Sequence, residues 1–84
     1  MTLEETRNYI VQICQFYPYY FNKINPSSAV PMWQKVFADM EYEFAQQALV
    51  ECIKEGQKQP SINELYRKAY DLKRRDFFAK GGRT

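Results

Sequence analysis

The sequence predicts an all-α protein, a compact bundle of four helices with a basic, flexible C-terminal tail. Four prolines and three glycines divide the 84 residues into four stretches. In each stretch the apolar residues recur at the spacing of three and four that marks one face of a helix. With 45% hydrophobic and 17% aromatic residues, the composition suits a single small domain whose thin core depends on every large side chain.

The first predicted helix begins after Thr2 and ends at Pro18. Thr2 and Glu5 have the spacing of a capping box, and a proline disfavours the α conformation in the residue before it. A loop is expected over residues 18–28, because it closes with Asn-Pro-Ser-Ser at 25–28, a turn-rich segment with two candidate N-caps. The apolar face of this helix comprises Leu3, Tyr9, Ile10, Ile13, Cys14 and Tyr17.

The second and third helices are expected to occupy the middle of the chain. The second begins near Ala29, with Trp33 among the core residues on its apolar face. Asp39 could cap a third helix, and Gly56 supplies its C-terminal cap. No proline or glycine separates the two helices, so one long bent helix over residues 29–55 remains an alternative. The third helix is expected to bury Ala45, Ala48, Leu49, Cys52 and Ile53.

The fourth helix is expected to begin at Ser61, which forms a second capping box with Glu64. Its apolar pattern stops at Leu72, and the charged residues from Lys73 onward are expected to fray into a mobile tail. The sequence therefore predicts a helical domain over residues 1–72 and a basic flexible tail over residues 73–84.

Catalysis is not expected. The chain has no histidine and no phosphate-binding glycine loop, and no pair of carboxylates is expected to be buried. We therefore expect no enzyme activity, no cofactor and no small-molecule substrate. Cys14 and Cys52 both fall on apolar faces, which favours free thiols in a reducing compartment over a disulfide or a zinc site. Without a membrane-spanning run or a signal peptide pattern, a cytoplasmic location without membrane contact is expected.

The charges are unevenly distributed, which points to the C-terminal end as a binding segment. Residues 1–66 carry five basic and eight acidic side chains, whereas residues 67–84 carry seven basic and two acidic ones. Two phenylalanines interrupt the basic residues, a pattern that suits a protein groove, single-stranded nucleic acid, or simply a solvated helix end. The basic segment consists of Arg67, Lys68, Lys73, Arg74, Arg75, Lys80 and Arg83. The predicted partner-binding residues here are Lys73, Arg74, Arg75, Phe77 and Phe78.

A second candidate surface is FYPYYF at residues 16–21, which places five aromatic residues around one proline. A thin core favours a structural role for Phe16, Tyr17 and Phe21. Tyr19 and Tyr20 are predicted partner contacts, because tyrosine is enriched at the energetic centres of interfaces. A symmetric oligomer interface through this cluster is a further interpretation.

Four motifs in order resemble the phage replicative-helicase loader/inhibitor family. The first helix ends in Phe-Tyr-Pro at 16–18, and the second contains Trp-Gln-Lys-Val-Phe at 33–37. An acidic-aromatic, alanine-rich helix start follows at 41–49, and the last motif is Gln-Pro-Ser-Ile-Asn-Glu-Leu at 59–65. Gln59 stands where the family often has a second proline, which affects only the turn. The resemblance covers about residues 4–70.

The resemblance implies a non-enzymatic adaptor. Members of this family bind a hexameric replicative helicase, hold its ATPase and DNA binding in check, and deliver it to an origin-bound initiator protein. The flexible C-terminal region of the family is associated with helicase contact, and it corresponds here to residues 73–84. The implied setting is the bacterial host of a phage or prophage. The alternative is a small DNA-binding protein that uses the fourth helix and basic tail, with steep salt dependence. Its acidic body counts against that alternative.

Overall fold

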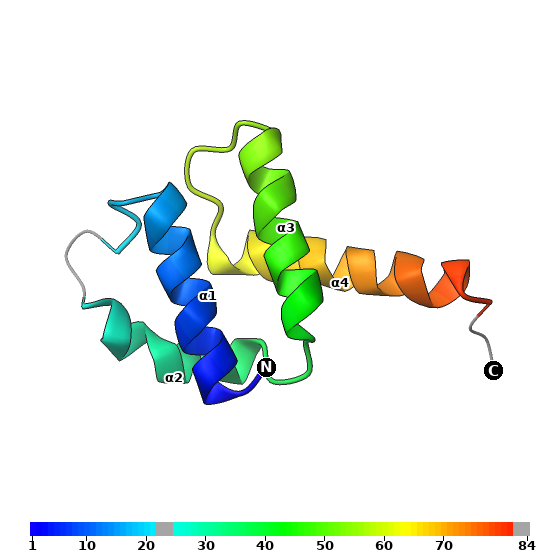
Figure 1. Cartoon of the computed structure of the whole chain (residues 1–84), viewed down its shortest axis with the longest axis horizontal. Coiled ribbons are helices and arrows are strands. Elements are labelled where there is room, and N and C mark those ends of the chain that lie inside the picture. Colours follow the sequence, from blue (N-terminus) through cyan, green and yellow to red (C-terminus); the bar gives the residue numbers. More distant parts are fainter. Residues whose placement is uncertain (22–24, 82–84) are drawn as a thin grey trace.

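The computed structural model describes residues 1–21 and 25–81, which form four helices joined by loops (Figure 1). The described residues contain no strand, which confirms the all-α prediction. A turn separates the second helix from the third, so the alternative of one long bent helix is wrong. The helices are α1 (Leu3–Phe16), α2 (Pro26–Val36), α3 (Tyr42–Lys54) and α4 (Ile62–Ala79).

Both predicted capping boxes are present. At the start of α1 the Glu5 amide donates to the Thr2 hydroxyl at 3.1 Å, and the Thr2 amide donates to the Glu5 carboxylate at 2.9 Å. Ser61 and Glu64 exchange the same pair of bonds at the start of α4, both at 3.1 Å. These bonds satisfy amide groups that would otherwise lack a partner in the first turn of each helix.

The two ends of the α2–α3 region differ from the prediction. α2 begins at Pro26 rather than Ala29, with the Asn25 side chain accepting from the Ser27 amide at 3.0 Å. Proline suits this first position because its fixed φ matches the helix and its missing N–H would have no partner there. Asp39 does not cap α3. Glu41 occupies that position without a side-chain bond. Residues 22–24 of the predicted loop lie outside the described residues.

α4 extends further than the sequence analysis predicted. The helix passes through Lys73 and continues to Ala79, so residues 73–79 are helical where a mobile tail was expected. No proline or glycine interrupts this stretch, and ion pairs one turn apart join Asp71 to Arg75 and Asp76 to Lys80. The helix therefore crosses the predicted boundary at residues 72 and 73 without a break. Arg83, the last residue of the basic segment, lies outside the described residues.

An aromatic core forms between α1 and α2 and extends under α3 and α4. The ring of Tyr9 lies 5.6 Å from that of Phe37 and 6.3 Å from that of Trp33, and none of the three is more than 6% exposed. Cys52 is buried and Cys14 is half-buried, and both are free thiols. Buried residues from all four helices complete the core, among them Ile10, Ile13, Val30, Ala45, Ala48, Leu49, Leu65, Ala69 and Leu72.

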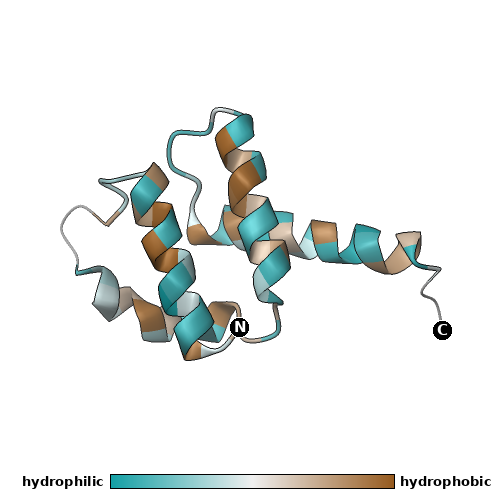
Figure 2. Ribbon diagram, in the orientation of Figure 1, coloured by the Kyte–Doolittle hydropathy of each residue, from teal (hydrophilic) through white to brown (hydrophobic). Residues whose placement is uncertain are grey.

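The C-terminal half of α4 projects beyond the other helices (Figure 1). Leu72 is the last buried residue of this helix. Figure 2 shows apolar and polar residues interleaved along the projecting half, which leaves aromatic side chains at a surface. None of the described helices is both long and apolar enough to cross a membrane.

Candidate functional site

Four of the predicted binding residues line one groove at the projecting half of α4. This groove has a volume of about 410 Å³ and lies between α4 and the loop that joins α2 to α3. Arg75, the fifth predicted residue of this segment, is not among its lining residues. We call this the α4 groove; its lining residues are Asp39, Tyr70, Lys73, Arg74, Phe77 and Phe78.

Helical spacing brings the aromatic residues of the α4 groove together. Tyr70, Phe77 and Phe78 lie about two turns apart on one side of the helix, with Arg74 between them. Their exposed fractions are 46%, 51% and 63%. The rings of Phe77 and Phe78 meet edge to face at 5.5 Å, and Tyr70 stacks on Tyr66 at 6.2 Å. The result is a continuous aromatic surface that no described element covers.

Charges at the edge of the groove are largely neutralised by the protein itself. The Lys73 ammonium contacts the Glu41 carboxylate at 3.0 Å and donates to the Asp39 carbonyl at 3.0 Å. The hydrogen bond from Lys73 lowers the pKa of the Glu41 carboxyl. Arg75 pairs with Asp71 on its own helix. Arg74 takes part in none of the ion pairs that join described residues, so its guanidinium is the groove cation available to a partner.

Asp39 forms the acidic rim of the α4 groove. The Tyr66 hydroxyl lies 3.2 Å from both carboxylate oxygens of Asp39. Burial, followed by this hydrogen bond, raises the pKa of the Tyr66 hydroxyl. The bond holds the side chain of Asp39 against α4 and so fixes the position of the rim.

The second predicted surface is divided between structure and exposure. Tyr20 is half-buried: its hydroxyl donates to the Pro60 carbonyl at 2.5 Å, and its ring lies 4.9 Å from Phe21 and 6.0 Å from Trp33. Burial is the main cause that raises the pKa of Tyr20 to about 12. Tyr20 therefore holds the corner after α1 on the α3–α4 loop. Tyr19, in contrast, is 76% exposed.

Phe16 differs from the structural role that the sequence predicts for it. Its side chain is 58% exposed and, with Tyr19 and Lys58, lines a shallow groove of about 340 Å³. Tyr17 and Phe21 pack against the core as expected, and the Tyr17 hydroxyl donates to the Gln57 carbonyl at 2.7 Å. The corner is thus fixed from below by two tyrosines while its outer aromatic side chains remain open.

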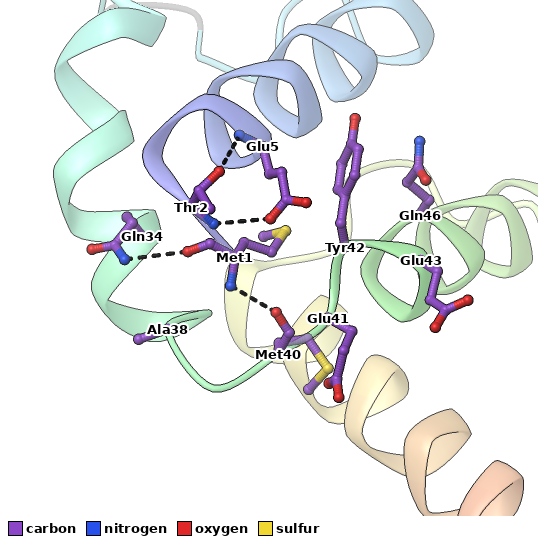
Figure 3. Close-up of a pocket in the computed structure, with 10 residues that line it drawn as sticks. All are labelled: Met1, Thr2, Glu5, Gln34, Ala38, Met40, Glu41, Tyr42, Glu43 and Gln46. Atoms are coloured by element: carbon purple, nitrogen blue, oxygen red, sulfur yellow. Dashed lines mark hydrogen bonds between the residues drawn. The ribbon is translucent and has the colours of Figure 1, made fainter.

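A larger open hollow, of about 800 Å³, lies beside the start of α1 (Figure 3). The amino group of Met1 donates to the carbonyls of Phe37 and Met40 at 2.8 and 2.7 Å, and the Gln34 side chain donates to the Met1 carbonyl at 3.2 Å. These bonds fasten the first residue to the α2–α3 loop. In the described part of the chain, no three side chains of His, Cys, Asp or Glu are grouped as metal ligands. We assign this hollow a structural role.

Sequence reasoning missed two residues of the α4 groove, Tyr70 and Asp39. Tyr66, Tyr70, Lys73 and Phe77 recur at intervals of four, three and four, a helical signal that continues past Leu72. That signal was available in the sequence, but it is visible only if the helix is extended. No local pattern indicates that Asp39 meets α4, because this contact depends on the packing of the α2–α3 loop.

A protein-family comparison gives one match. The family described as the N-terminal domain of a phage helicase loader/inhibitor matches residues 1–66. No curated protein and no solved structure matches the chain. Of the groove residues, Asp39 lies within the matched segment, and the residues from Tyr70 onward lie beyond it.

Proposed function

We propose that this chain, which belongs to the family of phage helicase loader/inhibitor N-terminal domains, is an adaptor that binds a hexameric replicative helicase. In this proposal it restrains the activity of the helicase and helps to load it at an origin through an initiator protein. It does so without catalysis of its own, in the cytoplasm of the bacterial host. The initiator is the second partner that the proposal requires.

The observation that carries this proposal is the aromatic surface of the α4 groove. Three rings between 46% and 63% exposed surround Arg74 on the half of α4 that projects from the body. Clustered exposed aromatic side chains with an arginine are typical of the energetic centres of protein interfaces. Because this half of the helix stands clear of α1, α2 and α3, a large ring-shaped partner can reach it without displacing the core.

The size of the groove also suits a reversible adaptor. The contact offered by two helical turns is small compared with a stable interface of about 1,600 Å². Its affinity is therefore expected to be moderate, which allows release once the helicase has been placed on DNA. Tyr19 and Phe16, on a separate corner, are left for the second partner in this proposal.

Binding of the full chain to the purified hexameric helicase of the phage or of its host tests the proposal. We expect the unaltered chain to co-migrate with the hexamer in size-exclusion chromatography and to reduce its ATPase rate. The double variant Phe77→Ser, Phe78→Ser should bind at least about tenfold more weakly, because hot-spot side chains each contribute roughly 2 kcal/mol or more. Val50→Ser is the matched control, since Val50 is 45% exposed and lies on α3, outside the groove.

Two results would contradict the proposal. If the unaltered chain binds neither helicase, the adaptor function is wrong. If it binds and the double variant binds equally well, the α4 groove is not the contact. Phe16→Ser, tested in the same assay and in a second assay with the initiator protein, then reports whether the other aromatic corner carries either contact.

The alternative of direct DNA binding has less support from the charges. Among the cations of α4, Lys68, Lys73, Arg75 and Lys80 each pair with a carboxylate of the protein. Strong nonspecific binding to DNA requires many free cations, and its affinity falls steeply with salt. We therefore expect no band shift of single- or double-stranded DNA at moderate salt. A shift that weakens steeply with added salt would instead favour the DNA-binding function.

A further inference from the structure

We infer that the α4 groove receives an amphipathic helix of the helicase that carries one carboxylate flanked by large apolar side chains. This inference rests on the proposed function and names the chemistry of the partner segment. Three features of the groove lead to it: its length along α4, the single available cation, and the position of that cation among the rings.

The length of the aromatic surface suits a short helix. Tyr70 and Phe78 are eight positions apart on α4, which corresponds to about 12 Å at 1.5 Å per residue. An amphipathic helix presents apolar side chains over the same distance at positions i, i+4 and i+7. A groove of about 410 Å³ has room for a few such side chains rather than for a folded domain.

The charge of the groove calls for one carboxylate. Lys73 is already held by Glu41 and by the Asp39 carbonyl, whereas Arg74 is in none of the ion pairs of the described residues. A guanidinium binds a carboxylate with two parallel hydrogen bonds, which gives direction as well as attraction. Aspartate or glutamate of the partner is therefore the group that complements Arg74.

The position of Arg74 places that carboxylate between apolar groups. Arg74 is four residues after Tyr70 and three before Phe77, so its side chain lies along the middle of the aromatic surface. The partner helix must accordingly carry its acid within a turn of the apolar side chains that cover the rings. Water excluded by those side chains strengthens the ion pair.

The same features argue against a nucleic-acid strand. One available cation cannot follow a series of phosphates, and the Asp39 carboxylate on the rim repels them. The rings of Phe77 and Phe78 pack edge to face, 78° apart, so they do not offer the parallel faces on which successive bases stack.

Photocrosslinking identifies the partner segment directly. A benzoylphenylalanine in place of Phe78, in the otherwise unaltered full chain, is irradiated in complex with the purified hexameric helicase, and the crosslinked peptide is sequenced. Phe78 is 63% exposed, so the replacement should not affect folding. We expect the crosslink to fall on a helical segment of the helicase with apolar residues at i and i+4 or i+7 and an aspartate or glutamate within one turn.

A charge exchange then tests the ion pair. Arg74→Glu should weaken helicase binding at least about tenfold, and a helicase variant with arginine in place of the crosslinked acid should restore most of that loss. Arg75→Glu is the matched control, because Arg75 is adjacent and exposed but pairs with Asp71 outside the groove. It should change the affinity by less than about twofold, the range expected for an exposed charge away from the contact.

The outcomes separate the inference from the proposed function. A crosslink to a basic or non-helical segment, to a second copy of this chain or to no part of a bound helicase overturns the inference while helicase binding stands. Equal effects of Arg74→Glu and Arg75→Glu, or no rescue by the exchanged charge, also overturn it. Absence of binding by the unaltered chain refutes the proposed function itself. A crosslink to added single-stranded DNA would assign the groove to nucleic acid instead.

Discussion

Replacing Tyr20 by phenylalanine removes one hydroxyl group and tests what fixes the corner after α1. In the structure this hydroxyl donates to the carbonyl of Pro60, a residue that is almost fully buried. The ring itself packs against Trp33 and Phe21, and phenylalanine keeps those contacts. The substitution therefore changes one hydrogen bond and little else.

The expected loss follows from the burial of both partners. A buried acceptor left without its donor costs about 1–3 kcal/mol, more than the net value of an exposed hydrogen bond. For a domain of this size, each kcal/mol corresponds to a decrease in Tm of about 4–8 °C. We therefore expect Tyr20→Phe to lower the free energy of unfolding by about 2 kcal/mol and the Tm by roughly 8–16 °C.

Thermal and urea unfolding followed by circular dichroism measure this effect. Tyr19→Phe is the matched control, because it removes the same group from the neighbouring residue, which is 76% exposed. Its effect should lie within about 0.5 kcal/mol, the range of surface substitutions. If Tyr20→Phe is as stable as Tyr19→Phe, the bond to Pro60 does not hold the corner, and the assignment of Tyr20 to structure is wrong.

Three other predictions follow from the backbone and the titrating groups. Gly56→Ala should lower the free energy of unfolding by about 1 kcal/mol in urea titrations, because Gly56 has φ +78° and only free space around its Cα. Lys73→Met should raise the pKa of the Glu41 carboxyl in an NMR titration, since the ammonium is what lowers it. At alkaline pH the unfolded chain loses the Tyr20 proton near pH 10, whereas the folded chain keeps it to about pH 12. Stability should therefore fall as pH rises through this window, and less steeply in Tyr20→Phe.

Local sequence rules predict the starts of α1 and α4 because a capping box is a bond between residues three apart. Thr2 with Glu5, and Ser61 with Glu64, need no information about the rest of the fold. The start of α3 is different. Asp39 has the residue type of an N-cap, yet its carboxylate accepts from Tyr66 on α4. A contact over 27 positions competes with the local rule, and only the packed structure shows which one prevails.

The candidate site could be predicted in part for the same reason. The residue types at 73–78 indicated a binding segment, and four of the five chosen residues line the α4 groove. The division of the aromatic corner could not be predicted, because Phe16, Tyr19 and Tyr20 are similar in sequence and differ only in what lies opposite. Pro60 lies opposite Tyr20, whereas Phe16 and Tyr19 face outward.

The relation between the family segment and the groove suggests what the body contributes to binding. The matched segment ends at Tyr66, within α4, and the aromatic residues of the groove follow on the same uninterrupted helix. Tyr66 and Lys73 both bond to Asp39, one on each side of that junction, so the α2–α3 loop holds the helix where the body ends. A helix clamped at its base cannot turn about its axis without breaking these bonds. The body therefore sets the direction in which Arg74 and the three rings face, and an adaptor that must place a helicase needs a contact with a fixed direction.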